Sequence, residues 1–186
     1  MRKAFEYGGI VASVILIVAG TGAVVTGFNG RDRVQDDLAR EKIVGTPDSS
    51  IPGQLVDTGK EAEAFSAVMR RHALEATDGR TYAEMGRFLD ENGKETDDEK
   101  AAAKDSATGQ PVENGARNIW VTETALSTAL NTAYFAERVS EFAIVMGFAL
   151  LLTGIGFLVL TLRVLRREPQ MPAKGPGAPE AAPTAS

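Results

Sequence analysis

One histidine and one glutamate have the spacing of a pair of metal ligands. His72 and Glu75 lie three residues apart, which places both side chains on one face of a helix. A non-haem iron site needs two histidines and a carboxylate, and a catalytic zinc site usually needs at least two histidine or cysteine ligands. The chain has one histidine and no cysteine. We therefore favour an ordinary helix histidine, with a metal site shared between two copies of the chain as an alternative.

An acidic run at residues 90–99 superficially resembles a calcium-binding loop. In such a loop the sixth position is glycine and the twelfth is glutamate. Counted from Asp90, these positions hold Glu95 and Ala101. The pattern therefore predicts a solvated charged loop. Weak cation binding stays open for three carboxylates of the run: Asp97, Asp98 and Glu99.

The remaining nucleophiles lack the partners that catalysis needs. Ser49, Ser50 and Ser66 have no base besides His72, and no Gly-x-Ser-x-Gly elbow occurs. The absence of cysteine excludes a thiol nucleophile, a disulfide and a Cys-based zinc site. No glycine-rich phosphate loop follows a strand. The sequence thus predicts a protein that is not an enzyme, and we assign it no cofactor and no catalytic, cofactor-binding or metal-binding residue.

Two long stretches without charge define the elements around these residues. The chain has 186 residues and a mean hydropathy of −0.09, yet positions 7–30 and 142–162 hold no charged residue. These stretches contain 24 and 21 residues, and a helix that crosses a bilayer needs roughly 20. We therefore predict membrane-spanning helices at residues 8–28 and 142–162.

The first stretch also has features of a cleaved signal peptide, because it follows Met1-Arg2-Lys3. Its apolar run continues to Phe28, beyond the about 7–15 residues of a signal-peptide core. No Ala-x-Ala cleavage triplet follows that core. We therefore favour an uncleaved anchor.

The charges around the two spans predict their orientation. A basic cluster follows the second span directly: Arg163, Arg166 and Arg167. Because such clusters stay in the cytoplasm, residues 1–7 and 163–186 are expected there, with residues 29–141 outside the plasma membrane. That outer segment carries 22 acidic and 14 basic side chains, the opposite of what nucleic-acid binding requires. The expected partners are the lipid bilayer and a protein, either a different one or a second copy, and no nucleic acid.

Turn residues divide the outer segment into helices and loops. A helix is expected at 33–43, which either continues the first span or restarts beyond a turn at Asn29-Gly30. The other expected elements are a proline-containing loop at 45–53, an amphipathic helix at 60–76, a short helix from the Thr81 capping box to Asp90, an exposed mobile segment at 94–110, and one long helix at 118–165. The apolar stripe of the amphipathic helix contains Ala62, Phe65, Val68 or Met69, His72 and Ala76. The proline-rich residues 169–186 are expected to form a disordered tail.

These elements predict an all-α fold. The helices that adjoin the two spans form an antiparallel stalk outside the membrane, and residues 45–117 fold over its far end as a cap. Small residues recur at helix-contact spacing in the spans, which suits close helix packing: Gly9 and Ser13, Ala19 and Ala23, Ala143 and Gly147, and Gly154.

Three segments together resemble a family of actinobacterial two-span membrane proteins. They are the elements Arg40–Asp48 (REKIVGTPD) and Gly79–Glu84 (GRTYAE), and the segment from Thr122 to Tyr134 that leads into the second span. The resemblance covers most of residues 8–162 and implies the same two-span topology. Many members carry the label "aromatic ring-opening dioxygenase". Ring cleavage by non-haem iron requires two histidines, so the one histidine here does not support that activity.

The sequence leaves three functions to compare. The first is a non-catalytic envelope protein whose outer domain binds a partner or self-assembles. The second is an accessory subunit of a transporter or channel; the uncharged spans offer no ion path of their own. The third is a metal-binding protein with His72 and Glu75 from each of two copies. We expect the first.

Overall fold

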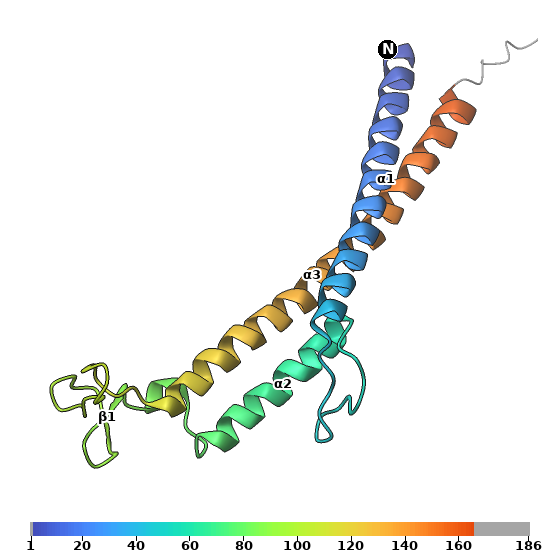
Figure 1. Ribbon diagram of the computed structural model, residues 1–186. Coiled ribbons are helices and arrows are strands. Elements are labelled where there is room, and N and C mark those ends of the chain that lie inside the picture. Colours follow the sequence, from blue (N-terminus) through green and yellow to red (C-terminus); the bar gives the residue numbers. More distant parts are fainter. Residues whose placement is uncertain (1, 166–186) are drawn as a thin grey trace, which may run out of the picture. The chain divides into compact units, whose positions relative to one another are not determined.

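The computed structural model describes residues 2–165, and these are mostly helical. Helices α1 (Arg2–Glu41), α2 (Gly59–Ala76) and α3 (Gly115–Leu160) form most of it (Figure 1), and a π-helical turn (Thr161–Leu165) follows α3. Two short strands, β1 (Phe88–Leu89) and β2 (Glu95–Thr96), pair antiparallel. The expected all-α architecture is therefore correct except for this small hairpin. The expected tail, with Arg166 and Arg167, lies outside the described residues.

Two helices are long and apolar enough to cross a membrane. They are Phe5–Arg40 and Gly115–Arg163, and only 11% of the most apolar window of each is buried. The chain divides into two compact units, Met1–Gly20 with Ala149–Ser186 and Thr21–Phe148. Each long helix contributes to both units.

In the first unit, the beginning of α1 packs against the end of α3 through small residues. Ser13 is fully buried, and its hydroxyl donates to the Gly9 carbonyl oxygen at 2.7 Å. A Cβ atom at Gly9 would lie 2.5 Å from the Thr161 hydroxyl oxygen, and one at Gly154 would lie 3.0 Å from the Ile17 backbone nitrogen. The helices therefore approach closely at positions where the sequence places small residues.

In the second unit, the end of α1 runs antiparallel to the beginning of α3. Later residues of α1 meet earlier residues of α3, since Gly30 packs against Ser140 while Leu38 shares a core with Leu130. The Asn29-Gly30 pair does not form a turn, and α1 continues through it. A Cβ at Gly30 would lie 2.8 Å from the Ser140 hydroxyl oxygen, so the glycine permits close packing within a helix.

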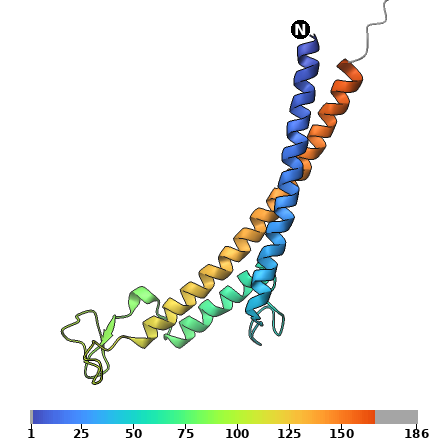
Figure 2. The ribbon, with the colours of Figure 1, turned by 45° about the horizontal axis from the view of Figure 1, so that its top comes forward.

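Helix α2 lies beside α3 in both views of the ribbon (Figures 1 and 2). The Asn131 amide donates to the Ser66 hydroxyl at 3.0 Å, and Gly59 packs against α3 at Tyr134 and Glu137. This part of the expected cap thus packs along α3. The buried stripe of α2 also differs from the expected one, because Ala73 is buried in place of His72 and Ala76.

Residues 78–114 form a small loop-rich region. The expected helix from Thr81 to Asp90 is wrong beyond a single 3-10 turn at Tyr82–Glu84. It ends there because Gly86 packs against β2 and its amide donates to Glu95. Residues 94–110 are mostly exposed, as expected, but backbone hydrogen bonds fix them. The Ala103 amide donates to the Leu89 carbonyl oxygen, and the Val112 amide donates to the Ala103 carbonyl oxygen.

Two clusters of apolar side chains form the core of the second unit. The larger joins α1, α2, α3 and the loop between α1 and α2: Leu38, Val56, Ala62, Phe65 and Leu130. The smaller surrounds Trp120, whose indole N–H donates to the Arg80 carbonyl oxygen at 2.9 Å and to the Thr77 hydroxyl at 3.2 Å. Packing against α2 and the residues that follow it therefore explains the tryptophan.

Candidate functional site

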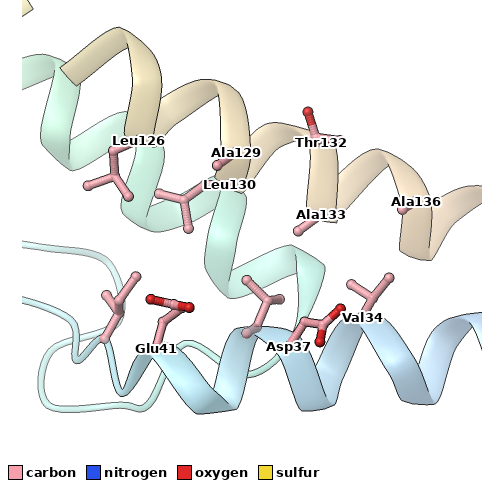
Figure 3. A pocket seen from close by; sticks show the side chains of 11 residues that line it. Val34, Asp37, Glu41, Leu126, Ala129, Leu130, Thr132, Ala133 and Ala136 are labelled. Atoms are coloured by element: carbon pink, nitrogen blue, oxygen red, sulfur yellow. The ribbon is translucent and has the colours of Figure 1, made fainter. Parts of the chain in front are cut away.

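An apolar groove lies between α1 and α3 on one side of the larger core cluster (Figure 3). Its volume is about 450 Å³. Apolar side chains from both helices line most of it: Val34, Leu38, Ile43, Leu126, Ala129, Leu130, Ala133 and Ala136. The groove is thus a place where the core of this unit opens to its surroundings.

Helix periodicity places the lining residues on facing sides of the two helices. Val34 and Leu38 are four residues apart on α1, and Leu126, Leu130 and Ala133 follow one another at spacings of four and three residues on α3. In Figure 3 the α1 side chains project toward α3, and Leu130 and Ala133 project back toward α1. Leu38 and Leu130 are nearly fully buried at the bottom of the groove.

Two carboxylates, Asp37 and Glu41, are the only charged side chains among the lining residues. Both are exposed and lie one turn apart on α1. Asp37 accepts a hydrogen bond from Arg40 on the same helix. The groove therefore combines an apolar floor with an acidic edge.

A buried carboxylate, Glu137, joins the three helices near one end of the groove. Its side chain is only 5% exposed. It accepts hydrogen bonds from the Gly59 amide at 2.6 Å and the Gln35 side-chain amide at 2.7 Å, and the Arg31 Nε lies 3.5 Å away. Gly59 begins α2, so Glu137 also lies where the helix dipole favours a negative charge. This network fixes α1, α2 and α3 relative to one another.

The loop that borders the other end of the groove is fastened to α2 through Asp48. The His72 Nε2 lies 2.8 Å from the Asp48 Oδ2, and Arg71 donates to both the carboxylate and the carbonyl oxygen of Asp48. The Thr46 hydroxyl, the His72 ring and the Arg71 guanidinium beside it hold the pKa of the Asp48 carboxyl well below its usual range. The loop between α1 and α2 is thus held by charge as well as by Val56.

The expected pair of metal ligands is divided between two different contacts. His72 faces Asp48, whereas Glu75 lies 3.8 Å from the Arg71 Nε. Within residues 2–165, no three histidine, cysteine, aspartate or glutamate side chains converge as a metal site would require. His72 and Glu75 would have to leave these contacts to act in a site shared between copies.

Four carboxylates of the acidic run bind the backbone or arginines of their own region: Asp90, Glu95, Asp97 and Asp98. Asp90 accepts from the Asn92 and Lys94 amides, and Asp98 accepts from the Lys100 amide. Glu95 accepts from Arg80 at 2.9 Å, and this guanidinium together with the Gly86 amide lowers the pKa of the Glu95 carboxyl. These contacts fit the solvated charged loop that the sequence predicts.

Two of the three serines considered as nucleophiles, Ser49 and Ser66, also have structural contacts. Ser49 donates to the Thr46 carbonyl oxygen at 2.6 Å within the loop between α1 and α2. Ser66 accepts from Asn131 at the seam between α2 and α3. Neither hydroxyl is hydrogen-bonded to His72, whose ring contacts Asp48.

No protein-family model, no curated protein and no solved structure matches the chain. The resemblance to actinobacterial two-span membrane proteins therefore stays a prediction, and any functional argument depends on the geometry of the chain itself. The groove was not predicted from the sequence. The local signal that points to it is the apolar spacing of Val34 and Leu38 on α1 and of Leu126, Leu130 and Ala133 on α3.

Proposed function

We propose that this chain is an integral plasma-membrane protein whose outer domain acts by binding another protein and not by catalysis. Residues 8–28 and 142–162 would cross the bilayer, with both termini in the cytoplasm and residues 29–141 outside. In this arrangement the ends of α1 and α3 that leave the bilayer form a stalk, and residues 78–114 form a cap at the start of α3.

Support for the membrane assignment comes from where apolar side chains are exposed. In the first unit large apolar residues point outward on both helices, among them Val11, Ile15, Val18, Leu152 and Ile155. Leu152 is 71% exposed. Such a surface is unfavourable in water and favourable in lipid, where outward apolar residues meet acyl chains.

The observation that carries the binding function is the apolar groove with its acidic edge. Exposed apolar concavities with a few polar groups mark sites of interaction in soluble domains. The residues considered for catalysis give no comparable support, because His72, Ser49 and Ser66 make structural contacts.

The topology is testable because the chain contains no cysteine. Single-cysteine variants Lys100→Cys and Ala181→Cys, in intact cells, are treated with a membrane-impermeant maleimide. We expect labelling of the Lys100 position at once and of the Ala181 position only after the membrane is permeabilised. Labelling of the Ala181 position in intact cells would overturn the orientation.

The binding function is tested by amine-reactive cross-linking of the full chain in native membranes, followed by identification of the products. We expect a reproducible product with a protein partner. A chain that stays a lone monomer at every reagent concentration would contradict the proposal. The shared metal site is tested separately, by measuring the metal content of the purified natural chain and of His72→Ala. We expect the same metal content in both.

A further inference from the structure

We propose that the groove receives an amphipathic helix of a second membrane protein, from the segment directly outside that protein's own membrane span, with a lysine or arginine along one edge. The inference rests on the proposed function and names the kind of partner. It is carried by the small residues of the groove, by its acidic edge, and by the short distance along α3 from the groove to the predicted second span.

Small side chains on α3 leave room for a helix. Ala129, Ala133 and Ala136 line the groove at spacings of four and three residues, which puts them on one face. Small residues at such spacing let a second helix backbone approach closely. Larger side chains, Leu38 and Leu130, close the bottom. A helix that lies along the alanines can therefore insert one or two apolar side chains between α1 and α3.

The charge of the groove determines which helix fits. Asp37 and Glu41 lie along the α1 edge, and no basic residue lines the groove. Across the described residues Glu41 has no ion pair or hydrogen bond from another side chain. A basic residue on the partner would meet these carboxylates at an exposed edge, where complementary charge gives specificity and a faster association.

A second copy of the chain fits this edge poorly. The outer segment has an excess of acidic side chains, 22 against 14 basic ones. Like charges placed opposite one another disfavour an association. The acidic edge therefore favours a different, basic partner over self-association through the groove.

The position of the groove indicates that the partner is itself in the membrane. Ala136 precedes Glu141, the end of the outer segment, by five residues, which is about 7 Å along a helix. A partner helix that lies in the groove therefore lies directly outside the predicted second span.

The test is site-specific photocross-linking of the full chain in native membranes. The photoreactive residue p-benzoylphenylalanine replaces either Ala129 or Thr132, which are exposed groove residues. Phe135 is the matched control, because it is 67% exposed on the same helix, does not line the groove and has nearly the same shape as the replacement. Cross-linked peptides are then sequenced.

We expect both groove positions to capture one and the same peptide, and the Phe135 position not to capture it. That peptide should lie within about 15 residues of a membrane span of another protein, given the ~22 Å from Leu126 to Glu141 along α3, and should contain lysine or arginine. The paired change Asp37→Lys with Glu41→Lys should lower the yield about tenfold or more. Asp97→Lys with Asp98→Lys, the matched control outside the groove, should leave it unchanged.

Several results would overturn the inference. The first group concerns what is captured: a second copy of the chain, a lipid, a peptide without a basic residue, or nothing at all from the groove positions. The second group concerns the controls: equal capture from the Phe135 position, or a yield that the charge reversal does not change. Asp37→Asn with Glu41→Gln, which keeps the shape, should give a smaller loss that grows weaker at high salt. These results leave the proposed function standing if cysteine labelling gives the proposed topology and amine-reactive cross-linking finds a protein partner. In that case only the inference about the groove fails.

Discussion

The two units of the chain place their apolar residues in opposite ways. In the first, small residues such as Ser13 and Gly154 lie between the helices, and large apolar residues such as Leu152 point outward. In the second, Val56, Leu130 and Trp120 are buried, and exposed charged side chains occur along residues 31–141. Because α1 and α3 each contribute to both units, one helix follows two packing rules along its length. The change occurs inside the second unit, at Arg31 on α1 and at Glu141 on α3, where charged residues begin.

Replacement of a large aromatic residue should have the largest effect, and only in the second unit. Trp120→Ala removes a side chain that is 3% exposed and hydrogen-bonded to the Arg80 carbonyl oxygen, so we expect a loss of about 3–5 kcal/mol in the free energy of unfolding. Leu152→Ala, the control in the first unit, should cost less than about 1 kcal/mol, since that side chain is 71% exposed and loses little packing. Urea titration in detergent micelles, followed by far-ultraviolet circular dichroism, measures both. Similar losses would remove the contrast between the units.

Loss of the Glu137 charge should have the next largest effect. Glu137→Gln replaces one acceptor oxygen by an amide donor, opposite the donors of Gly59 and Gln35. We expect a loss of about 3 kcal/mol in the same urea titration, because a buried group is left without a partner. Glu141→Gln is the control four residues later on α3. Glu141 is 38% exposed and pairs with Arg138, so its replacement should cost less than about 1 kcal/mol. Equal losses would show that Glu137 does not join the helices.

Two glycines of α3 sharpen the description of the first unit. A Cβ at Gly154 would lie 2.8 Å from the Ile17 Cγ1 and 3.0 Å from its backbone nitrogen, whereas Gly156 has nothing within 4 Å. Gly154→Ala should therefore cost about 1–3 kcal/mol through separation of the helices. Gly156→Ala should be neutral or stabilise by up to about 1 kcal/mol. Thermal unfolding in micelles compares them, and a harmless Gly154→Ala would mean that the helices do not pack at this point.

The smallest effect concerns the pH dependence of the loop between α1 and α2. Folding lowers the pKa of Asp48 below its ordinary value of 3.8, so its contribution to stability is complete above that value and is lost as the pH falls toward the folded pKa. We therefore compare the amide hydrogen exchange of residues 43–57 at pH 5 and at pH 3, each corrected for the intrinsic exchange rate at that pH. The corrected rate should increase more in the natural chain than in Asp48→Asn. In the variant, protection should already be reduced at pH 5. Identical pH dependence in both would show that the contact to Arg71 and His72 does not hold the loop.

The sequence predicted the long elements because their signals are local. The charge-free stretches indicated the apolar parts of α1 and α3, and the stripe of Ala62, Phe65 and Val68 indicated α2. Local signals were less informative about length. Thr81 and Glu84 form a capping box at a single turn, while the same spacing at Thr58 and Glu61 begins a helix of 18 residues. The residues that come after each box decide how far the helix extends.

The contacts that define the groove could not be predicted from spacing, because they join distant parts of the chain. His72 meets Asp48 from a loop 24 residues earlier, and Glu137 meets Gly59 across 78 residues. Helix periodicity predicts on which face of its own helix each residue lies, but it does not predict which face of another helix packs against it. The groove depends on that choice, since Val34 and Leu130 acquire a common role only when α1 lies beside α3.

The contacts that α3 makes with α1 and α2, through Leu130 and Glu137, have a consequence for folding during synthesis. Synthesis proceeds from the N-terminus, so Leu38, Val56 and Phe65 exist before Leu130 and Glu137 do. Their apolar surface stays open until α3 emerges, and contacts between distant residues form slowly. Helix α3, the last of the three helices to be synthesised, thus completes the core. A nascent chain that stops before residue 130 exposes the apolar side chains of α1 and α2, and these can aggregate with other chains unless a chaperone covers them.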